Sequence, residues 1–454
     1  MRGANRPTEK ELTKIFDDAK KVFFVGIGGI SMSSLAEYCI YLGKEVYGYD
    51  RERNEACQKL EQVAKNIKYC STPDSASHMD LVVYTTAVPF DNFEIQCAIR
   101  EGLPLVSRAE LLNCIMQGYK NRIGVAGMHG KSTVSAMIGH IYEEADRDPT
   151  IFCGAVMKGF LSPYKFGKRN DFIFEACEYK DAFLKFSPTD AVILNMDLDH
   201  PDYFTSREQI IASFQKYAKK GKRVFLCADD EMSKELKVSP SRAVRFGIYN
   251  EADYVAKEIS LGECTSFSIF KEGVPIVRCK MRGAGLHTVY NGLCAFAVAY
   301  ENGINKEAIK NALYSFSGTE RRLEYYKKSR GGGRIFIDYA HHPKEISTTL
   351  SAIKNMGYSN ILCVFQPHTF SRTHFLYKEF CRCFTDASCL IITDTYSARE
   401  ENVYGVKESE LARATGGEYV KSIEKIGEII NECSNDAIII MGAGDIIKIK
   451  KFIK

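Results

Sequence analysis

The stretch 122-RIGVAGMHGKSTVSAMIGHIYEEA-145 puts a short apolar segment directly before a glycine turn and a helix-like segment. The first N–H groups of a helix and the positive end of its dipole favour a bound phosphate. Lys131 follows the turn and can reach the β- and γ-phosphates, and Ser132 can bind Mg²⁺. Val125 stands where a full P-loop has its first glycine. The stretch therefore predicts a strand–turn–helix unit that holds a nucleoside triphosphate, the alternative being a structural turn.

A second glycine turn, Gly26-Ile-Gly28-Gly29-Ile-Ser31, follows the apolar stretch VFFV near the start of the chain. It is an incomplete dinucleotide fingerprint, because Ser31 replaces the third glycine, and Asp50 closes the next apolar stretch. A phosphate-containing nucleotide is one interpretation of this turn. Glycines that serve only a tight turn are the other.

Outward from these turns, the 454 residues suggest about three domains. Apolar strands alternate with helical segments from residue 22, the pattern restarts at Arg122, and it restarts again after the glycines at 331–333. Such alternation is typical of parallel sheets with helical crossovers. We expect an α/β protein with a Rossmann-like domain at 1–117, a P-loop-type ATPase domain with a mixed sheet at 118–319, and a second Rossmann-like domain at 320–454.

Composition excludes several classes of function. The chain has 61 basic and 57 acidic residues, a net charge of +4 that is too small to favour nucleic acid as a partner. No apolar run approaches the roughly 18 residues that cross a bilayer. The first residues lack an apolar signal-peptide core, and the 16 cysteines show no metal or redox spacing. We expect a cytoplasmic protein with reduced cysteines and no membrane insertion.

Polar residues gather where the middle strands end. Glu175 and Glu178 lie in FIFEACEY at 172–179. The stretch LNMDLDHPDY at 194–203 contains Asn195, Asp197, Asp199 and His200. Ligands in open α/β folds bind at this edge of the sheet. Oxygen ligands suit Mg²⁺, although histidine is unusual for so hard an ion.

The last third of the chain carries a different set, with Asp338, His341 and His342 after one strand and His368 and Arg372 after the next. Arginine pairs with carboxylates, and histidine titrates near neutrality. This combination suits an acidic substrate that bears an amine. Six of the nine histidines lie beside the turns and strand ends of the chain, namely His129, His200, His287, His341, His342 and His368.

These motifs together resemble the Mur ligases of peptidoglycan synthesis over nearly the whole chain. The matching segments, in order, are GIGGISMSSLAE, SRAELL, GMHGKST, FEACEY, NMDLDHPDYF, GLHTVYN, FSGTERRLE, DYAHHPKEI, FQPHTFSRT and GAGDI. The resemblance implies ATP-dependent, Mg²⁺-requiring ligation of L-alanine to the lactyl carboxylate of UDP-N-acetylmuramate through an acyl phosphate, by a monomer or weak dimer. It also implies an N-terminal domain for the UDP sugar, a central ATPase domain and a C-terminal domain that closes over both.

The resemblance further implies roles for individual residues. The implied ATP-binding residues are Gly127, Met128, His129, Gly130, Lys131, Ser132, Thr133, His287, Asn291, Arg321 and Asp338. The implied UDP-sugar residues are Gly28, Gly29, Ile30, Asp50, Thr86 and Ser107. The implied Mg²⁺ ligands are Ser132, Glu175 and His200. The implied catalytic residues are Lys131, Glu175, His200, His341, His368 and Arg372, with Tyr339 beside them in the amino-acid pocket.

Four positions depart from the family wording, and they keep alternatives open. Met128 replaces a common threonine, Cys177 an aspartate, Ile337 the first aspartate of a pair, and Thr288 an asparagine beside the ATP base. Thr288 leaves room for a catalytically altered paralogue that binds nucleotide. Another Mur-type or folylpolyglutamate-type amide ligase is a further alternative. A nicotinamide-dependent oxidoreductase would explain the first glycine turn, but not a second one with a lysine.

Overall fold

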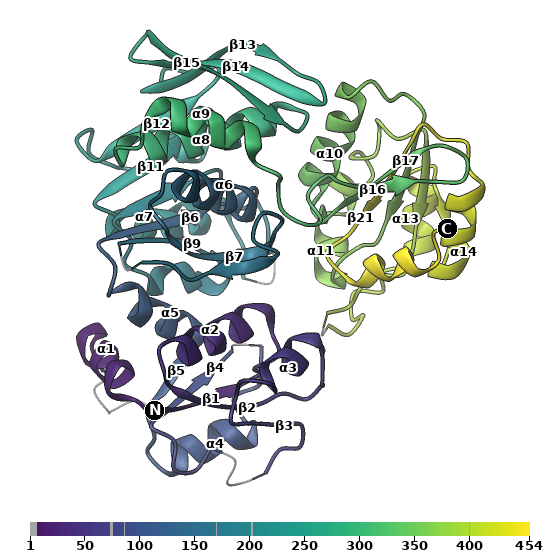
Figure 1. Ribbon diagram of the computed structural model, residues 1–454. Helices are drawn as coiled ribbons and strands as arrows, with labels where there is room; N and C mark the ends of the chain where they lie inside the picture. The colour runs from purple at the N-terminus through teal and green to yellow at the C-terminus, as the bar shows by residue number, and fades with distance from the viewer. Residues whose placement is uncertain (1–6, 73–75, 86, 169, 201–202, 399) are drawn as a thin grey trace.

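The computed structural model describes residues 7–72, 76–85, 87–168, 170–200, 203–398 and 400–454. These residues form three separate sheets, one after another along the chain (Figure 1). The three-part α/β architecture expected from the alternation of strands and helices is therefore confirmed.

The N-terminal sheet has the strand order β3-β2-β1-β4-β5, and all of its pairs are parallel. Its strands are β1 (Lys21–Val25), β2 (Glu45–Tyr49), β3 (Asn66–Lys68), β4 (Leu81–Tyr84) and β5 (Leu105–Ser107), with helices α1 (Glu9–Asp18), α2 (Ile30–Tyr41), α3 (Glu55–Leu60), α4 (Phe93–Arg100) and α5 (Arg108–Met116). The strand order reverses between β1 and β4, so the glycine turn after β1 lies at the switch point where such sheets bind ligands.

The middle sheet has ten strands in the order β15-β14-β13-β12-β11-β10-β6-β9-β7-β8. The strands are β6 (Asn121–Ala126), β7 (Thr150–Met157), β8 (Ser162–Lys165), β9 (Asp171–Glu175), β10 (Asp190–Ile193), β11 (Arg223–Cys227), β12 (Ala243–Gly247), β13 (Tyr254–Ser260), β14 (Cys264–Lys271) and β15 (Val274–Arg282). The helices are α6 (Lys131–Glu144), η1 (Tyr179–Lys185), α7 (Arg207–Lys220), η2 (Ser233–Glu235), α8 (Leu286–Glu301) and α9 (Lys306–Ser315). The sheet is mixed, because β8, β14 and β15 pair antiparallel with their neighbours.

The C-terminal sheet has the order β16-β17-β21-β18-β19-β20, with β16 antiparallel and the rest parallel. Its strands are β16 (Glu324–Lys328), β17 (Arg334–Asp338), β18 (Ile361–Phe365), β19 (Cys389–Ile392), β20 (Glu418–Tyr419) and β21 (Ala437–Met441). Its helices are α10 (Pro343–Asn355), α11 (Phe370–Phe375), α12 (Tyr377–Phe380), α13 (Glu408–Ala414), α14 (Ile423–Glu432) and η3 (Asp445–Lys451).

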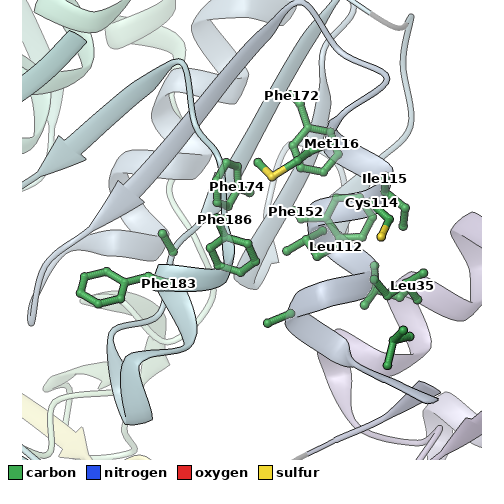
Figure 2. Close-up of a cluster of buried hydrophobic side chains, with 14 of the residues drawn as sticks. Leu35, Leu112, Cys114, Ile115, Met116, Phe152, Phe172, Phe174, Phe183 and Phe186 are labelled. Atoms are coloured by element: carbon green, nitrogen blue, oxygen red, sulfur yellow. The ribbon is translucent and has the colours of Figure 1, made fainter. Parts of the chain in front are cut away.

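The N-terminal and middle parts share one apolar core. Leu35 of α2 and Met116 of α5 belong to the same buried cluster as Phe152, Phe172 and Phe186 of the middle part (Figure 2). The buried clusters of the C-terminal part contain only its own residues. Because shared apolar burial holds surfaces together, the first two parts form one body, and the third meets it mainly through the polar contacts described below.

All sixteen cysteines are free thiols. In the part of the chain that the structure describes, we find no helix with the length and apolar character needed to span a membrane.

Candidate active site

The phosphate loop connects β6 to α6, as its sequence predicts. Gly127 and Gly130 have φ values of 140° and 83°, which disfavour any residue with a side chain. A Cβ at Gly130 would also lie 3.1 Å from Oδ1 of Asn291, on α8. The loop therefore needs these glycines both for its backbone path and for the close approach of α8.

Lys131 lies at the first position of α6 with its ammonium held over the loop. Its Nζ donates to Gly127 O at 2.6 Å and pairs with Glu178 at 3.0 Å. Burial opposes this charge, but Glu178 and the neighbouring acidic groups outweigh burial and raise the lysine pKa above its ordinary value. Lys131 is therefore a permanent cation at the start of α6.

One part of the site is made of oxygen-bearing side chains, from Ser132, Glu175 and Glu178. The Ser132 hydroxyl donates to Glu175 at 2.7 Å, and His200 Nε2 lies 3.4 Å from Glu178. One hydroxyl, two carboxylates and one imidazole beside a phosphate loop fit a Mg²⁺ ion that also binds phosphate oxygens. Of the predicted ligands, Ser132 and Glu175 are therefore in direct contact, and Glu178 lies between Lys131 and His200.

Asn291 on α8 lies against the phosphate loop at Gly130, and His287 lies one turn earlier on the same helix. Burial lowers the His287 pKa to about 4, and its Nδ1 is buried without a hydrogen bond. Thr288, in contrast, donates its hydroxyl to Ala284 O at 3.1 Å, just before the start of its own helix. The hydroxyl of Thr288, which stands where the family has an asparagine, therefore has a hydrogen-bond partner four residues earlier in the chain.

Arg321 and Asp338 lie where the chain enters the C-terminal part. The Arg321 guanidinium donates to Gly444 O at 3.1 Å and lies 4.8 Å from the Tyr339 ring centre, while its Nε is buried without a hydrogen bond. Asp338 accepts from the N–H groups of Leu323 and Ala340, and burial raises its pKa to about 6.

The predicted amino-acid residues come together at the ends of β17 and β18. The His341 and His368 rings are 5.7 Å apart, and Arg372 Nη1 lies 3.2 Å from His368 Nδ1. Burial lowers the pKa of His341 to about 4 and that of His368 to about 3, so both rings are neutral at pH 7. Arg372 also pairs at 3.0 Å with Asp199 of the middle part, which joins this pocket to the loop that carries His200.

A cluster of His129, Asp197 and His342 bridges the middle and C-terminal parts. Each residue brings one ligand atom within 4.8 Å of the others. The Lys344 ammonium lies 3.0 Å from Asp197, and His342 Nε2 donates to Leu198 O at 3.2 Å. The charge of Asp197 is thus balanced by protein groups.

Sequence reasoning missed Glu345 and Arg322. Glu345 lies 3.2 Å from His129 and 3.3 Å from His341, and Arg322 lies 3.8 Å from Glu345. The spacing His342-x-x-Glu345 was the available signal, since a cap followed by glutamate at the third helical position marks a helix start. That signal predicts a helix, not a contact with another domain.

The predicted UDP-sugar residues divide into two places. Gly28 and Gly29 lie in the turn before α2, Ile30 is the first residue of that helix, and Asp50 accepts from Gly28 N at 2.8 Å. Ser107, at the end of β5, donates to Glu110 and accepts from Lys185 of the middle part at 2.9 Å. Thr86 lies outside the described residues. The structure therefore joins Asp50 to the glycine turn and places the Ser107 hydroxyl at the contact between the first two parts.

Comparison with known proteins gives matches along the whole chain. Three domain models match in order: Mur ligase family, catalytic domain at 21–120, Mur ligase middle domain at 125–299, and Mur ligase, glutamate ligase domain at 321–444. The UDP-N-acetylmuramate–L-alanine ligase of Clostridium perfringens is 36% identical over 446 residues, 95% of this chain and 97% of that protein. The corresponding ligase of Caldanaerobacter subterraneus is 38% identical over 449 residues, 96% of this chain and 97% of that protein.

Solved structures show the same architecture. The UDP-N-acetylmuramate-alanine ligase of Thermotoga maritima matches with a TM-score of 0.81 and 26% identity, over 95% of this chain and 98% of that one. A murein peptide ligase of Psychrobacter arcticus, at 22% identity and a TM-score of 0.69, shares the fold. From its domain order, its phosphate loop and these full-length matches, we conclude that the chain belongs to the Mur ligase family.

Proposed function

We propose that this protein ligates L-alanine to the lactyl carboxylate of UDP-N-acetylmuramate, with ATP and Mg²⁺, in the synthesis of the peptidoglycan precursor. The observation that carries the proposal is the meeting of two groups of side chains from different sheets. Lys131 and His200 both lie against Glu178 beside the phosphate loop, and Glu175 accepts from Ser132 at the start of α6. The Asp199–Arg372 pair joins the loop that carries His200 to His341 and His368. The names of the full-length relatives agree with this activity.

The phosphate side of the reaction needs charge and position more than covalent chemistry. We propose that Lys131 and the N-terminus of α6 neutralise the ATP phosphates, with His287, Asn291, Arg321 and Asp338 around the nucleotide. Ser132, Glu175 and His200 would hold Mg²⁺, which supplies further neutralisation of phosphate charge. The lactyl carboxylate attacks the γ-phosphorus, ADP leaves, and an acyl phosphate results.

The amine of alanine must lose a proton to attack the acyl carbon. His342 uses both ring nitrogens, one to Leu198 O and one to cap Lys344 N. His341 Nδ1 donates to Tyr339 O at 3.0 Å, which leaves Nε2 of this neutral ring with its lone pair. His368 accepts from Arg372 at Nδ1, so its proton is on Nε2 and this ring has no free lone pair. We therefore propose His341 as the proton acceptor and Arg372 as the group that holds the alanine carboxylate, after which phosphate leaves the acyl carbon.

We further propose that the UDP sugar binds at Gly28, Gly29 and Ile30, with Asp50 fixing that turn, and that Thr86 and Ser107 also contact the sugar nucleotide. The three domains would divide at 1–117, 118–319 and 320–454, in a cytoplasmic protein that acts as a monomer or weak dimer.

The test is phosphate release from ATP with Mg²⁺, with UDP-N-acetylmuramate and the amino acid each omitted in turn. We expect release only when both are present, and faster release with alanine than with glycine or serine. Phosphate release that requires a different acid in place of UDP-N-acetylmuramate, or a different amine in place of alanine, would show that the protein is another amide ligase. Nucleotide binding without any release would favour the altered paralogue.

A further inference from the structure

Glu345 lies at the start of α10 and divides its carboxylate between two tasks. One oxygen, Oε2, accepts from the N–H groups of His341 at 3.1 Å and His342 at 3.3 Å, which completes the helix cap. The other, Oε1, lies 3.2 Å from Nδ1 of His129, in the phosphate loop of the middle domain. The cap therefore uses one oxygen, and the second connects two domains.

The glutamate of the capping box in α1 shows what capping alone requires. Glu11 interacts through Oε2 with the N–H and hydroxyl of Thr8, in the same helix start. It lies on the surface, whereas the Glu345 side chain is only 12% exposed. A capping box thus does not explain why Glu345 is buried against His129 and Arg322.

His129, the histidine that Glu345 contacts, is held both at its backbone and at its ring. Asn195 bonds the His129 backbone, accepting from its N–H at 2.9 Å and donating to its carbonyl at 3.0 Å. Glu345 holds the ring, and Gly130 and Lys131 follow directly in the chain. The position of the phosphate loop is therefore tied to the first turn of α10.

The same carboxylate also touches the amino-acid pocket. His341 Nδ1 lies 3.3 Å from Oε2, and Arg322 lies 3.8 Å from Oε1. Glu345 is thus one negative charge among His129, His341 and Arg322, at the boundary between the ATP side and the amine side. An amide at this position would keep the shape and the cap but would lose the charge.

We propose that Glu345 is a positioning residue that fixes the phosphate loop relative to the amino-acid pocket, so that the acyl phosphate forms within reach of the amine. This inference rests on the proposed function for its kinetic consequence. The structural consequence, a phosphate loop held across the domain boundary, does not depend on which substrates are used.

The test compares Glu345→Gln with the matched capping-box variant Glu11→Gln, using the full chain. In amide hydrogen exchange without ligands, we expect Glu345→Gln to speed exchange in the phosphate loop at 127–131, which is in the other domain. A purely local cap would change exchange only around 341–346. Unchanged exchange at 127–131 in Glu345→Gln would overturn the proposal, and Glu11→Gln should leave both segments as in the wild type.

The kinetic arm uses ATP, UDP-N-acetylmuramate and alanine. Misplacement of reacting groups by about 1 Å costs about 10²-fold in rate, so we expect kcat to fall on that order. The KM for UDP-N-acetylmuramate should stay unchanged, because that substrate binds the N-terminal domain. An unchanged kcat, or a raised KM for the sugar nucleotide with normal kcat, would contradict the proposal. If the wild-type protein is inactive with these substrates, the proposed function is contradicted. The hydrogen-exchange comparison at 127–131 would still decide whether Glu345 positions the phosphate loop.

Discussion

Asp199 of the middle domain and Arg372 of the C-terminal domain form a buried ion pair, with Nε and Nη2 of the arginine both 3.0 Å from Oδ1 of the aspartate. The Arg372 side chain is 6% exposed and the Asp199 side chain 5%. Burial opposes the charge of Asp199, but Arg372 and the nearby histidines outweigh it and hold the pKa of this carboxyl far below its usual range. The pair connects the loop that carries His200, which we propose as a Mg²⁺ ligand, to Arg372, which we place at the amino-acid carboxylate.

The first prediction concerns this pair. Asp199→Ala leaves a buried guanidinium without its partner, a change that typically costs about 3–5 kcal/mol. Because, among the residues that the structure describes, the C-terminal domain shares no apolar core with the other two, we expect the cost to appear as separation of that domain. Small-angle scattering should show a larger radius of gyration than in the wild type. An unchanged scattering curve with unchanged stability would show that the pair does not hold the domains together.

The second prediction concerns Lys131. Loss of one group that stabilises transition-state charge typically costs about 10² to 10³ in rate. We expect Lys131→Ala to lose that much kcat while still folding, as measured by phosphate release and circular dichroism. Lys10→Ala, on the exposed face of α1, is the control. Turnover by Lys131→Ala at the wild-type rate would remove the phosphate loop from the mechanism.

The third prediction concerns Glu175, which accepts from the Ser132 hydroxyl. Glu175→Gln removes a negatively charged ligand. Loss of a group that only supports a metal ligand already lowers metal affinity by about 10-fold to 100-fold, so the Mg²⁺ concentration for half-maximal activity should rise by at least about tenfold. Glu144→Gln, at the exposed end of the same α6, should keep the wild-type requirement. A normal Mg²⁺ titration of Glu175→Gln would exclude Glu175 as a ligand.

The fourth prediction concerns pH and His129. Burial alone would lower its pKa, but Asp197 and Glu345 raise it to about 9. The group therefore stabilises the fold fully below its unfolded pKa of about 6.5, and this contribution fades as the pH rises through 9. The thermal midpoints of wild type and His129→Gln should differ most near pH 6 and converge near pH 10. A difference that grows with pH would contradict the charged form of His129.

The sequence predicts the parts of this site that are local in the chain. The phosphate loop is one continuous strand, turn and helix, and Ser132 follows directly from it, so their geometry is contained in a few residues. Residues that follow parallel strands lie at the same sheet edge, as the alternation of elements predicts. Glu178, after β9, and His200, after β10, accordingly lie 3.4 Å apart.

The contacts between domains could not be predicted in this way. Asp199 and Arg372 each have an identifiable chemistry, but their pairing depends on how the C-terminal domain packs against the middle domain. The contact of Glu345 with His129 could not be predicted for the same reason. The spacing of Glu345 from His342 indicates only a helix cap. The antiparallel strands β8 and β16 have no distinctive pattern in the sequence, because short edge strands carry little periodicity.

The most direct test of the proposed reaction follows an oxygen atom. UDP-N-acetylmuramate labelled with ¹⁸O in its lactyl carboxylate is incubated with ATP, Mg²⁺, alanine and the enzyme, and both products are analysed by mass spectrometry. If the carboxylate attacks the γ-phosphorus and the amine then displaces phosphate, the label appears in inorganic phosphate, in equal amount to the alanyl product. Unlabelled phosphate, or phosphate without the alanyl product, would contradict the ligase mechanism.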